Sequence, residues 1–205
     1  VLAQANRNLL YVDEVNLLDD HIVDLLLDSA AMGVNYVERE GVSFSHPSKF
    51  ILVGSMNPEE GDLRPQLLDR FGLCIDIVGE RNISYRADVV LRRLEFDADP
   101  AGFTSKYRQE TEALRESVKR ARSEISKIVL SREMVMAVSE IAIHFEMEGH
   151  RADITMIRAA RANAALEGRT EITKEDLERV APMVLGHRIR RKPFEDSKFN
   201  RGEME

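Results

Sequence analysis

The sequence has 205 residues, 43% of them hydrophobic and 32% charged, a balance typical of a globular protein with one large domain or two small ones. Its formal net charge of −7 argues against a protein that binds the phosphate backbone of nucleic acids, which normally needs a basic face. No apolar stretch is long enough to cross a bilayer, and the single cysteine, Cys74, excludes a disulfide within the chain.

The apolar run Leu9–Val12 ends in two adjacent carboxylates, Asp13 and Glu14. Such a run predicts a strand buried on both faces of a parallel sheet, and ligands bind beyond the carboxyl ends of such strands. There Asp13 can hold Mg²⁺ through its water shell, while Glu14 orients and polarises the water that attacks a γ-phosphate. This is the Walker B pattern of a nucleoside triphosphatase. The alternative is an ordinary strand that is followed by two acidic residues without a catalytic role.

A P-loop nucleotidase also needs a G-x-x-x-x-G-K-[ST] loop, whose backbone N–H groups and lysine cradle the phosphates. No such loop occurs in the sequence. Either the acidic pair serves another purpose, or the chain is a fragment cut after that loop. We take the second interpretation and expect the fragment alone to be inactive.

Residues 19–32 carry apolar side chains at helical spacing and predict an amphipathic helix. Residues 34–38 and 42–46 alternate around a glycine turn, which predicts a β-hairpin, either a finger of the nucleotide domain or a surface loop. Residues 50–56 predict a second buried strand. Asn57 follows it and could hydrogen-bond the attacking water or the γ-phosphate, although Asn before Pro is also ordinary turn chemistry.

Residues 63–71 predict a short helix and residues 73–78 a further strand, in which Cys74 would be a buried small hydrophobe. Arg64 and Arg70 are the candidate phosphate-facing cations. An arginine fork suits a phosphoryl transition state, and a neighbouring subunit often supplies it. The alternative is a surface salt bridge.

After residue 83 the predicted elements are all helical. A loop at 97–102 suggests a domain boundary, and Arg151 at the start of a later helix could reach the phosphates. A capping-box-like start at 173–176 begins the last helix, which Pro182 should kink or interrupt. The basic stretch 187–192 has no interleaved aromatic residues, so we disfavour a nucleic-acid patch. The helices are expected over residues 84–94, 103–124, 131–148, 152–166 and from 173 onward.

In this order of parts the sequence resembles the AAA+ ATPases, and more narrowly the ATPase subunit I of magnesium chelatase. The resemblance implies an α/β fold: the C-terminal part of an AAA+ P-loop nucleotidase core, with a parallel sheet and a hairpin insert over 33–46, followed by an all-helical lid domain. The corresponding domains are the core at 1–98, the lid at 99–192 and a flexible tail at 193–205. The stretches that carry the resemblance are residues 11–20, 33–42, 57–73 and 151–162.

The resemblance also implies roles for particular residues. Asp13 would coordinate the Mg²⁺ of MgATP through water and Glu14 would activate the attacking water. Asn57 would be the sensor 1 residue, and Arg70 the arginine finger that acts on the ATP of the next subunit. Arg151 would be the sensor 2 arginine, which contacts bound nucleotide.

The implied activity is ATP hydrolysis, with ATP and Mg²⁺ as cofactors, in a homo-oligomeric ring of six subunits. With a D-type AAA+ subunit and a porphyrin-binding H-type subunit, the ring would drive insertion of Mg²⁺ into protoporphyrin IX, a step of chlorophyll biosynthesis. We expect a cytoplasmic protein, or one of the plastid stroma in a plant. The alternatives are a non-hydrolysing AAA+ scaffold, a MoxR-like remodelling ATPase and a cobalt chelatase motor.

Overall fold

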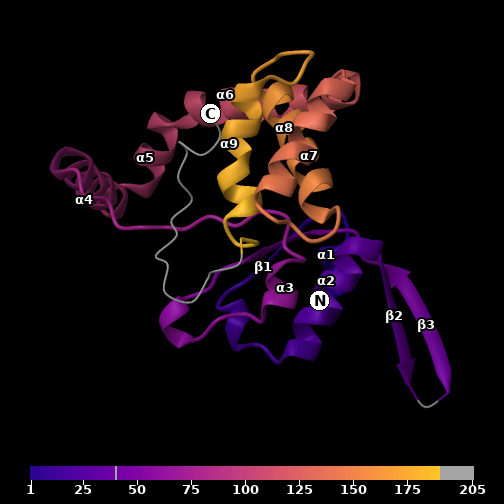
Figure 1. Cartoon of the computed structure of the whole chain (residues 1–205). Helices are drawn as coiled ribbons and strands as arrows, with labels where there is room; N and C mark the ends of the chain where they lie inside the picture. The colour runs from indigo at the N-terminus through magenta and orange to yellow at the C-terminus, as the bar shows by residue number, and fades with distance from the viewer. Residues whose placement is uncertain (40, 190–205) are drawn as a thin grey trace. The chain divides into compact units, whose positions relative to one another are not determined.

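The computed structural model describes residues 1–39 and 41–189, and the chain divides into two compact units, Val1–Gly72 and Leu73–Glu205 (Figure 1). This division falls before residue 98, the domain boundary suggested by the sequence, and that boundary stays a prediction. The predicted tail at 193–205 and the end of the basic stretch lie outside the described residues. The first unit contains, in chain order, α1 (Leu2–Ala5), β1 (Leu9–Val12), η1 (Val15–Leu17), α2 (Asp20–Met32), β2 (Val34–Arg39), β3 (Val42–Pro47), β4 (Ile51–Gly54), η2 (Pro58–Glu60) and α3 (Pro65–Leu68).

The centre of the first unit is a parallel pair of strands, β1 and β4, in register from Leu9 opposite Ile51 to Val12 opposite Gly54. The prediction of a parallel sheet is confirmed, but burial on both faces is wrong for this chain. Leu9 and Tyr11 are 57% and 56% exposed. Side chains alternate between the faces of a strand, and only the face that carries Val12 packs against a core.

That core lies between the strand pair, α2 and α3. Val23 of α2 is fully buried, and Val15, Leu27, Leu63 and Leu67 complete the buried cluster. The helix predicted at 19–32 is therefore confirmed, and Gly33 ends it in the left-handed conformation with φ of +70°. The hairpin is also confirmed: β2 and β3 pair antiparallel and project beyond α2 (Figure 1).

The second unit is helical. α6, α7, α8 and α9 pack around a core in which Val138, Met156, Val184 and Leu185 are almost entirely buried. α4 has no buried residue and, with α5, leads away from this bundle (Figure 1). The elements are α4 (Ile83–Ala98), α5 (Pro100–Lys106), α6 (Arg108–Glu124), η3 (Ile125–Lys127), α7 (Arg132–His144), α8 (Arg151–Leu166) and α9 (Lys174–Leu185).

Alanines on one face of α8 allow this helix to pack closely on its neighbours, because a methyl side chain keeps two backbones near each other. Ala160 and Ala164 are fully buried and Ala165 is almost so. The predicted capping box of α9 is confirmed, since the Asp176 carboxylate accepts the N–H of Thr173 at 2.8 Å. Pro182 lies inside α9 without ending it, because the helix continues to Leu185.

The strand predicted at 73–78 is wrong. This segment has no regular structure, and Ile77 is 88% exposed. Its apolar alternation lacks a partner strand among the described residues, and one backbone bond, from Cys74 N–H to the Met183 carbonyl, ties it to α9. Cys74 is half-buried rather than buried.

The loop predicted at 97–102 is mostly helical. Asp99 caps α5 by accepting the Gly102 N–H at 2.9 Å, and its own backbone separates α4 from α5. The long helix predicted at 103–124 is broken at Tyr107, where α5 ends and α6 begins.

Candidate functional site

The carboxyl ends of β1 and β4 form one edge of the parallel strand pair, and the predicted catalytic residues follow these two strands. Asp13 and Glu14 come directly after β1, and Asn57 comes three residues after β4. Two backbone hydrogen bonds extend the pairing past the strands: Ser55 N–H to the Val12 carbonyl at 3.0 Å, and Val15 N–H to the Ser55 carbonyl at 2.9 Å. The topology thus brings the acidic pair and Asn57 to the same edge.

The Asp13 carboxylate is held by two hydroxyl groups. Tyr11 donates to Oδ1 at 2.9 Å, and the Ser55 hydroxyl donates to the same oxygen. These hydrogen bonds, with Ser55 first, lower the pKa of Asp13 below its ordinary value, so the carboxylate is ionised at neutral pH. An ionised, solvent-exposed carboxylate at a strand end fits a Mg²⁺ ion that keeps most of its water shell.

Ser55 also orients Glu14, because its hydroxyl oxygen accepts the Glu14 N–H at 2.9 Å. One side chain from the end of β4 therefore contacts both acidic residues. The sequence reasoning missed Ser55 and Tyr11. The sequence held one signal for Ser55, its position: it directly follows β4, just as Asp13 directly follows β1.

The backbone of Glu14 is left-handed, with φ of 51° and ψ of 52°, which is uncommon for a residue with a side chain. The turn is imposed by the packing around it. Val15 is buried immediately afterwards, and a Cβ atom placed on Gly54 would lie 3.0 Å from its Cγ1. Gly54 therefore permits the close approach of η1 to β4.

Asn57 has a local structural contact. Its side-chain oxygen accepts the N–H of Glu59 at 3.2 Å and so caps η2. Asn16 ties this turn to the acidic turn by donating to the carbonyls of Gly61 at 2.8 Å and of Asn57 at 3.4 Å. The sensor 1 role of Asn57 stays a prediction.

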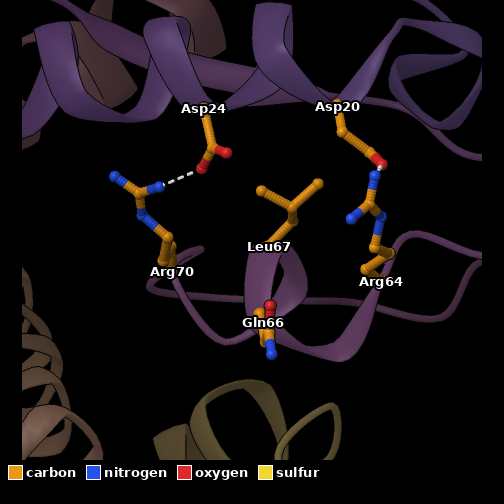
Figure 2. A pocket seen from close by; sticks show the side chains of 6 residues that line it. All are labelled: Asp20, Asp24, Arg64, Gln66, Leu67 and Arg70. Carbon is orange, nitrogen blue, oxygen red and sulfur yellow. Dashed lines mark hydrogen bonds and ion pairs between the residues drawn. The ribbon is translucent and has the colours of Figure 1, made fainter.

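Arg70 lies against α2, as Figure 2 shows. Its Nη1 pairs with Asp24 and its Nη2 with Asp28, while Arg64 pairs with Asp20 one turn earlier on the same helix. A pocket between α2 and α3 is lined by Asp20, Asp24, Arg64, Gln66, Leu67 and Arg70. The salt-bridge alternative for Arg64 and Arg70 is thus present, and the finger role of Arg70 stays a prediction.

Arg151 is the first residue of α8, in the second unit. The acidic edge belongs to the first unit, and the sensor 2 role of Arg151 also stays a prediction. Within residues 1–39 and 41–189, no group of three or more His, Cys, Asp or Glu side chains is arranged to hold a metal. No described helix is long and apolar enough to cross a membrane.

The sequence of this chain is similar to a family model and to curated proteins. Residues 135–205 match the model of the AAA lid domain. The magnesium-chelatase subunit ChlI homolog of Methanocaldococcus jannaschii is 50% identical over 205 residues, which is 100% of this chain and 56% of that protein. The magnesium-chelatase subunit ChlI of Synechocystis is 51% identical over 195 residues, 95% of this chain and 55% of that protein. The chain thus spans about half the length of the curated relatives it matches.

The crystal structure of a protein from Cytophaga hutchinsonii has the same fold. It is 20% identical and covers 89% of this chain and 58% of its own, with a TM-score of 0.64. This likeness supports the α/β core followed by a helical lid.

Proposed function

This chain belongs to the ChlI type of AAA+ proteins, and from that premise we propose that it is the Walker B, sensor and lid part of the ATPase motor of a magnesium chelatase. The motor hydrolyses ATP, and a larger complex uses the free energy to insert Mg²⁺ into protoporphyrin IX. Because the 205 residues contain no G-x-x-x-x-G-K-[ST] loop, the proposal requires a phosphate-binding loop outside them.

The observation that carries the proposal is the arrangement of Asp13, Glu14 and Ser55 at the carboxyl edge of the parallel strands. In open α/β sheets this edge is where ligands bind. The Ser55 hydroxyl contacts the Asp13 carboxylate and the Glu14 backbone together, so the Asp13 carboxylate and the backbone that carries Glu14 are held in place before nucleotide arrives. Preorganised charge of this kind costs no rearrangement during reaction.

In the proposed mechanism Asp13 would hold Mg²⁺ through water, and the bound ion would supply positive charge to the phosphate oxygens. Glu14 accepts a proton from the attacking water as general base. Asn57, on the same edge, orients this water or the γ-phosphate. Arg70 stabilises transition-state charge on the ATP of the neighbouring subunit, and Arg151 contacts the nucleotide from the lid.

We further propose that the subunits form a hexameric ring, because an arginine finger that acts between subunits needs a repeated head-to-tail interface. A D-type AAA+ subunit and a porphyrin-binding H-type subunit are the expected partners. In this arrangement the tetrapyrrole site lies on the H-type subunit and outside this chain.

The proposal is tested by Mg²⁺-dependent ATP hydrolysis in the protein that contains this chain together with a phosphate-binding loop. Glu14→Gln should leave ATP binding intact and lower turnover by about 10²-fold or more, since only the proton acceptor is lost. Glu60→Gln is the matched control, because Glu60 is an exposed carboxylate on η2 near the same edge. It should keep normal turnover.

Normal turnover in Glu14→Gln would remove Glu14 from the mechanism. Absence of hydrolysis in every variant, at concentrations that form rings, would favour a non-hydrolysing scaffold. For an active motor, addition of D-type and H-type subunits with protoporphyrin IX and either Mg²⁺ or Co²⁺ would then identify the metal. Hydrolysis that responds to a protein client instead would favour a remodelling ATPase.

A further inference from the structure

α2 carries a row of three aspartates, Asp20, Asp24 and Asp28, spaced four residues apart. Residues at this spacing lie one above the other on a single face of a helix, so their charges repel one another. An isolated helix is destabilised by such a row. Here the row is neutralised from outside the helix by Arg64 and Arg70, which flank α3.

α3 is held against this acidic face by an apolar contact as well as by the ion pairs. Leu67, which projects between the two arginines in Figure 2, is 5% exposed and packs into the core cluster with Val23 and Leu27. The backbone around Arg70 is therefore fixed by burial. The ion pairs then determine where its guanidinium points.

The guanidinium of Arg70 is held by two carboxylates at once. Nη1 contacts Asp24 and Nη2 contacts Asp28, and these two acids are one helical turn apart on α2. Two contacts on different nitrogens define the plane of the group as well as its position. A guanidinium has five N–H donors, so these contacts leave donors for a phosphate. The Arg70 side chain is 24% exposed, so part of it reaches solvent.

We propose that Asp24 and Asp28 are positioning residues for Arg70. They hold its guanidinium in one orientation, so that its remaining donors face the nucleotide of the adjacent subunit when the ring forms. The inference rests on the proposed function, in which Arg70 acts between subunits. A long, flexible arginine loses conformational freedom when it meets a phosphate, and an arginine already held in its plane loses less.

Asp20 provides a matched control for this inference. It lies on the same face of α2 and pairs with an arginine beside α3, but its partner is Arg64 rather than Arg70. Asp20→Asn therefore breaks an ion pair between α2 and α3 without touching the guanidinium of Arg70. Any general loosening of α3 should affect this control and the test variants alike.

The experiment measures steady-state ATP hydrolysis by the whole protein with Asp24→Asn and Asp28→Asn combined, beside Asp20→Asn and Arg70→Ala. We expect the double variant to lower kcat by roughly 10-fold to 100-fold with little change in KM for ATP, as a small misplacement of a catalytic group does. Asp20→Asn should stay within about twofold of the parent, and both should melt at similar temperatures. Added to Arg70→Ala, the double variant should cause no further loss.

Mixed rings separate positioning from a structural defect. Subunits with the two Asp→Asn changes keep their own acidic pair, whereas subunits with Asp13→Asn keep Arg70 and its partners. Mixing the two should restore part of the activity, because the intact Arg70 of one subunit then faces the intact site of the other. A fold defect in the double variant would not be restored in this way.

Three results would overturn the inference. Unchanged kcat in the double variant, while Arg70→Ala is inactive, would show that Arg70 needs no positioning by α2. Raised kcat would show that the aspartates restrain Arg70 instead. Reduced kcat without recovery in mixed rings would show a defect within the subunit. Full activity in Arg70→Ala, or none in the parent protein, would refute the proposed function itself and this inference with it.

Discussion

Replacing Arg169 by Met should destabilise the helical unit, because it leaves the buried carboxylate of Asp176 without its cation. The Asp176 side chain is fully buried. Arg169 donates from Nη1 to Oδ2 at 2.7 Å and from Nη2 to Oδ1 at 2.5 Å. Asn163 donates to Oδ1 at 2.6 Å, and the Thr173 N–H donates to Oδ2 at 2.8 Å. These donors link α8, α9 and the turn between them.

Removing one partner of a buried ion pair costs about 3–5 kcal/mol in the free energy of unfolding. The cost should be smaller here, because Asn163 and the Thr173 N–H remain and because Arg169 is itself 36% exposed. We therefore expect a loss of about 2–3 kcal/mol. For a chain of this size that corresponds to a fall in Tm of roughly 5–10 °C.

The assay is thermal and urea denaturation followed by circular dichroism at helical wavelengths. Arg115→Met is the control, because Arg115 pairs with Glu112 along the exposed face of α6 and such a pair contributes at most about 0.5 kcal/mol. If Arg169→Met and Arg115→Met melt within a degree of each other, the argument from the buried carboxylate is refuted.

Three further predictions concern Asp176, Met156 and Ser55. Burial opposes ionisation of Asp176, but the hydrogen bonds led by Arg169 outweigh it and lower its pKa from 3.8 to about 2. Because the folded-state pKa is depressed, the ionised Asp176 contributes at most about 2 kcal/mol to the free energy of unfolding above pH 4, and this contribution is lost as the pH falls from about 4 to 2. A free energy of unfolding that does not change over this pH range would contradict the prediction. Met156→Ala should lower the free energy of unfolding by about 2–5 kcal/mol, because it opens a cavity in the core. Met136→Ala, at an exposed position of α7, should change it little, and urea denaturation of the two variants tests the difference. Ser55→Ala should raise the activation free energy of ATP hydrolysis by the proposed motor by about 1 kcal/mol, which lowers turnover roughly fivefold. Ser55→Thr keeps the hydroxyl and is the control. Equal rates in the two variants would show that the Ser55 hydroxyl has no part in the site.

The elements that could be predicted from sequence are those whose pattern is set locally. The helix at α2 follows from apolar residues at helical spacing, and the hairpin follows from alternation around Gly41, whose φ of +82° suits glycine. The strands β1 and β4 followed from their short apolar runs. Each of these signals lies within a few residues of the element it predicts.

The failures depend on contacts far away in the chain. Residues 73–78 have the alternation of a strand, but a strand exists only when another strand pairs with it, and the described residues supply none. Likewise the apolar run Leu9–Val12 predicted two buried faces, whereas this chain covers one of them. Composition shows that a surface is apolar but does not show what covers it.

The same distinction holds for the candidate site. Asp13, Glu14 and Asn57 could be placed at one edge because parallel strands end at the same side of a sheet. Ser55 and Asn16 could not be assigned, because their hydrogen bonds depend on the register between β1 and β4 and on the turn after β4. Which residues of the two strands lie opposite one another is decided only when the strands pair, so the sequence alone does not show these contacts.

α2 connects the two chemically important parts of the first unit. It begins shortly after the turn that holds Glu14, and the face that it turns toward α3 carries the aspartates that hold Arg70. On its inner face Val23 packs in one cluster with Val15, beside the acidic turn, and with Leu67 of α3. In a ring motor the water-activating carboxylate serves the subunit's own nucleotide, whereas the finger serves the next one. Because one packed helix supports Glu14 and Arg70, the proposed function predicts that a shift of the acidic turn during hydrolysis is passed to Arg70 and so to the neighbouring site.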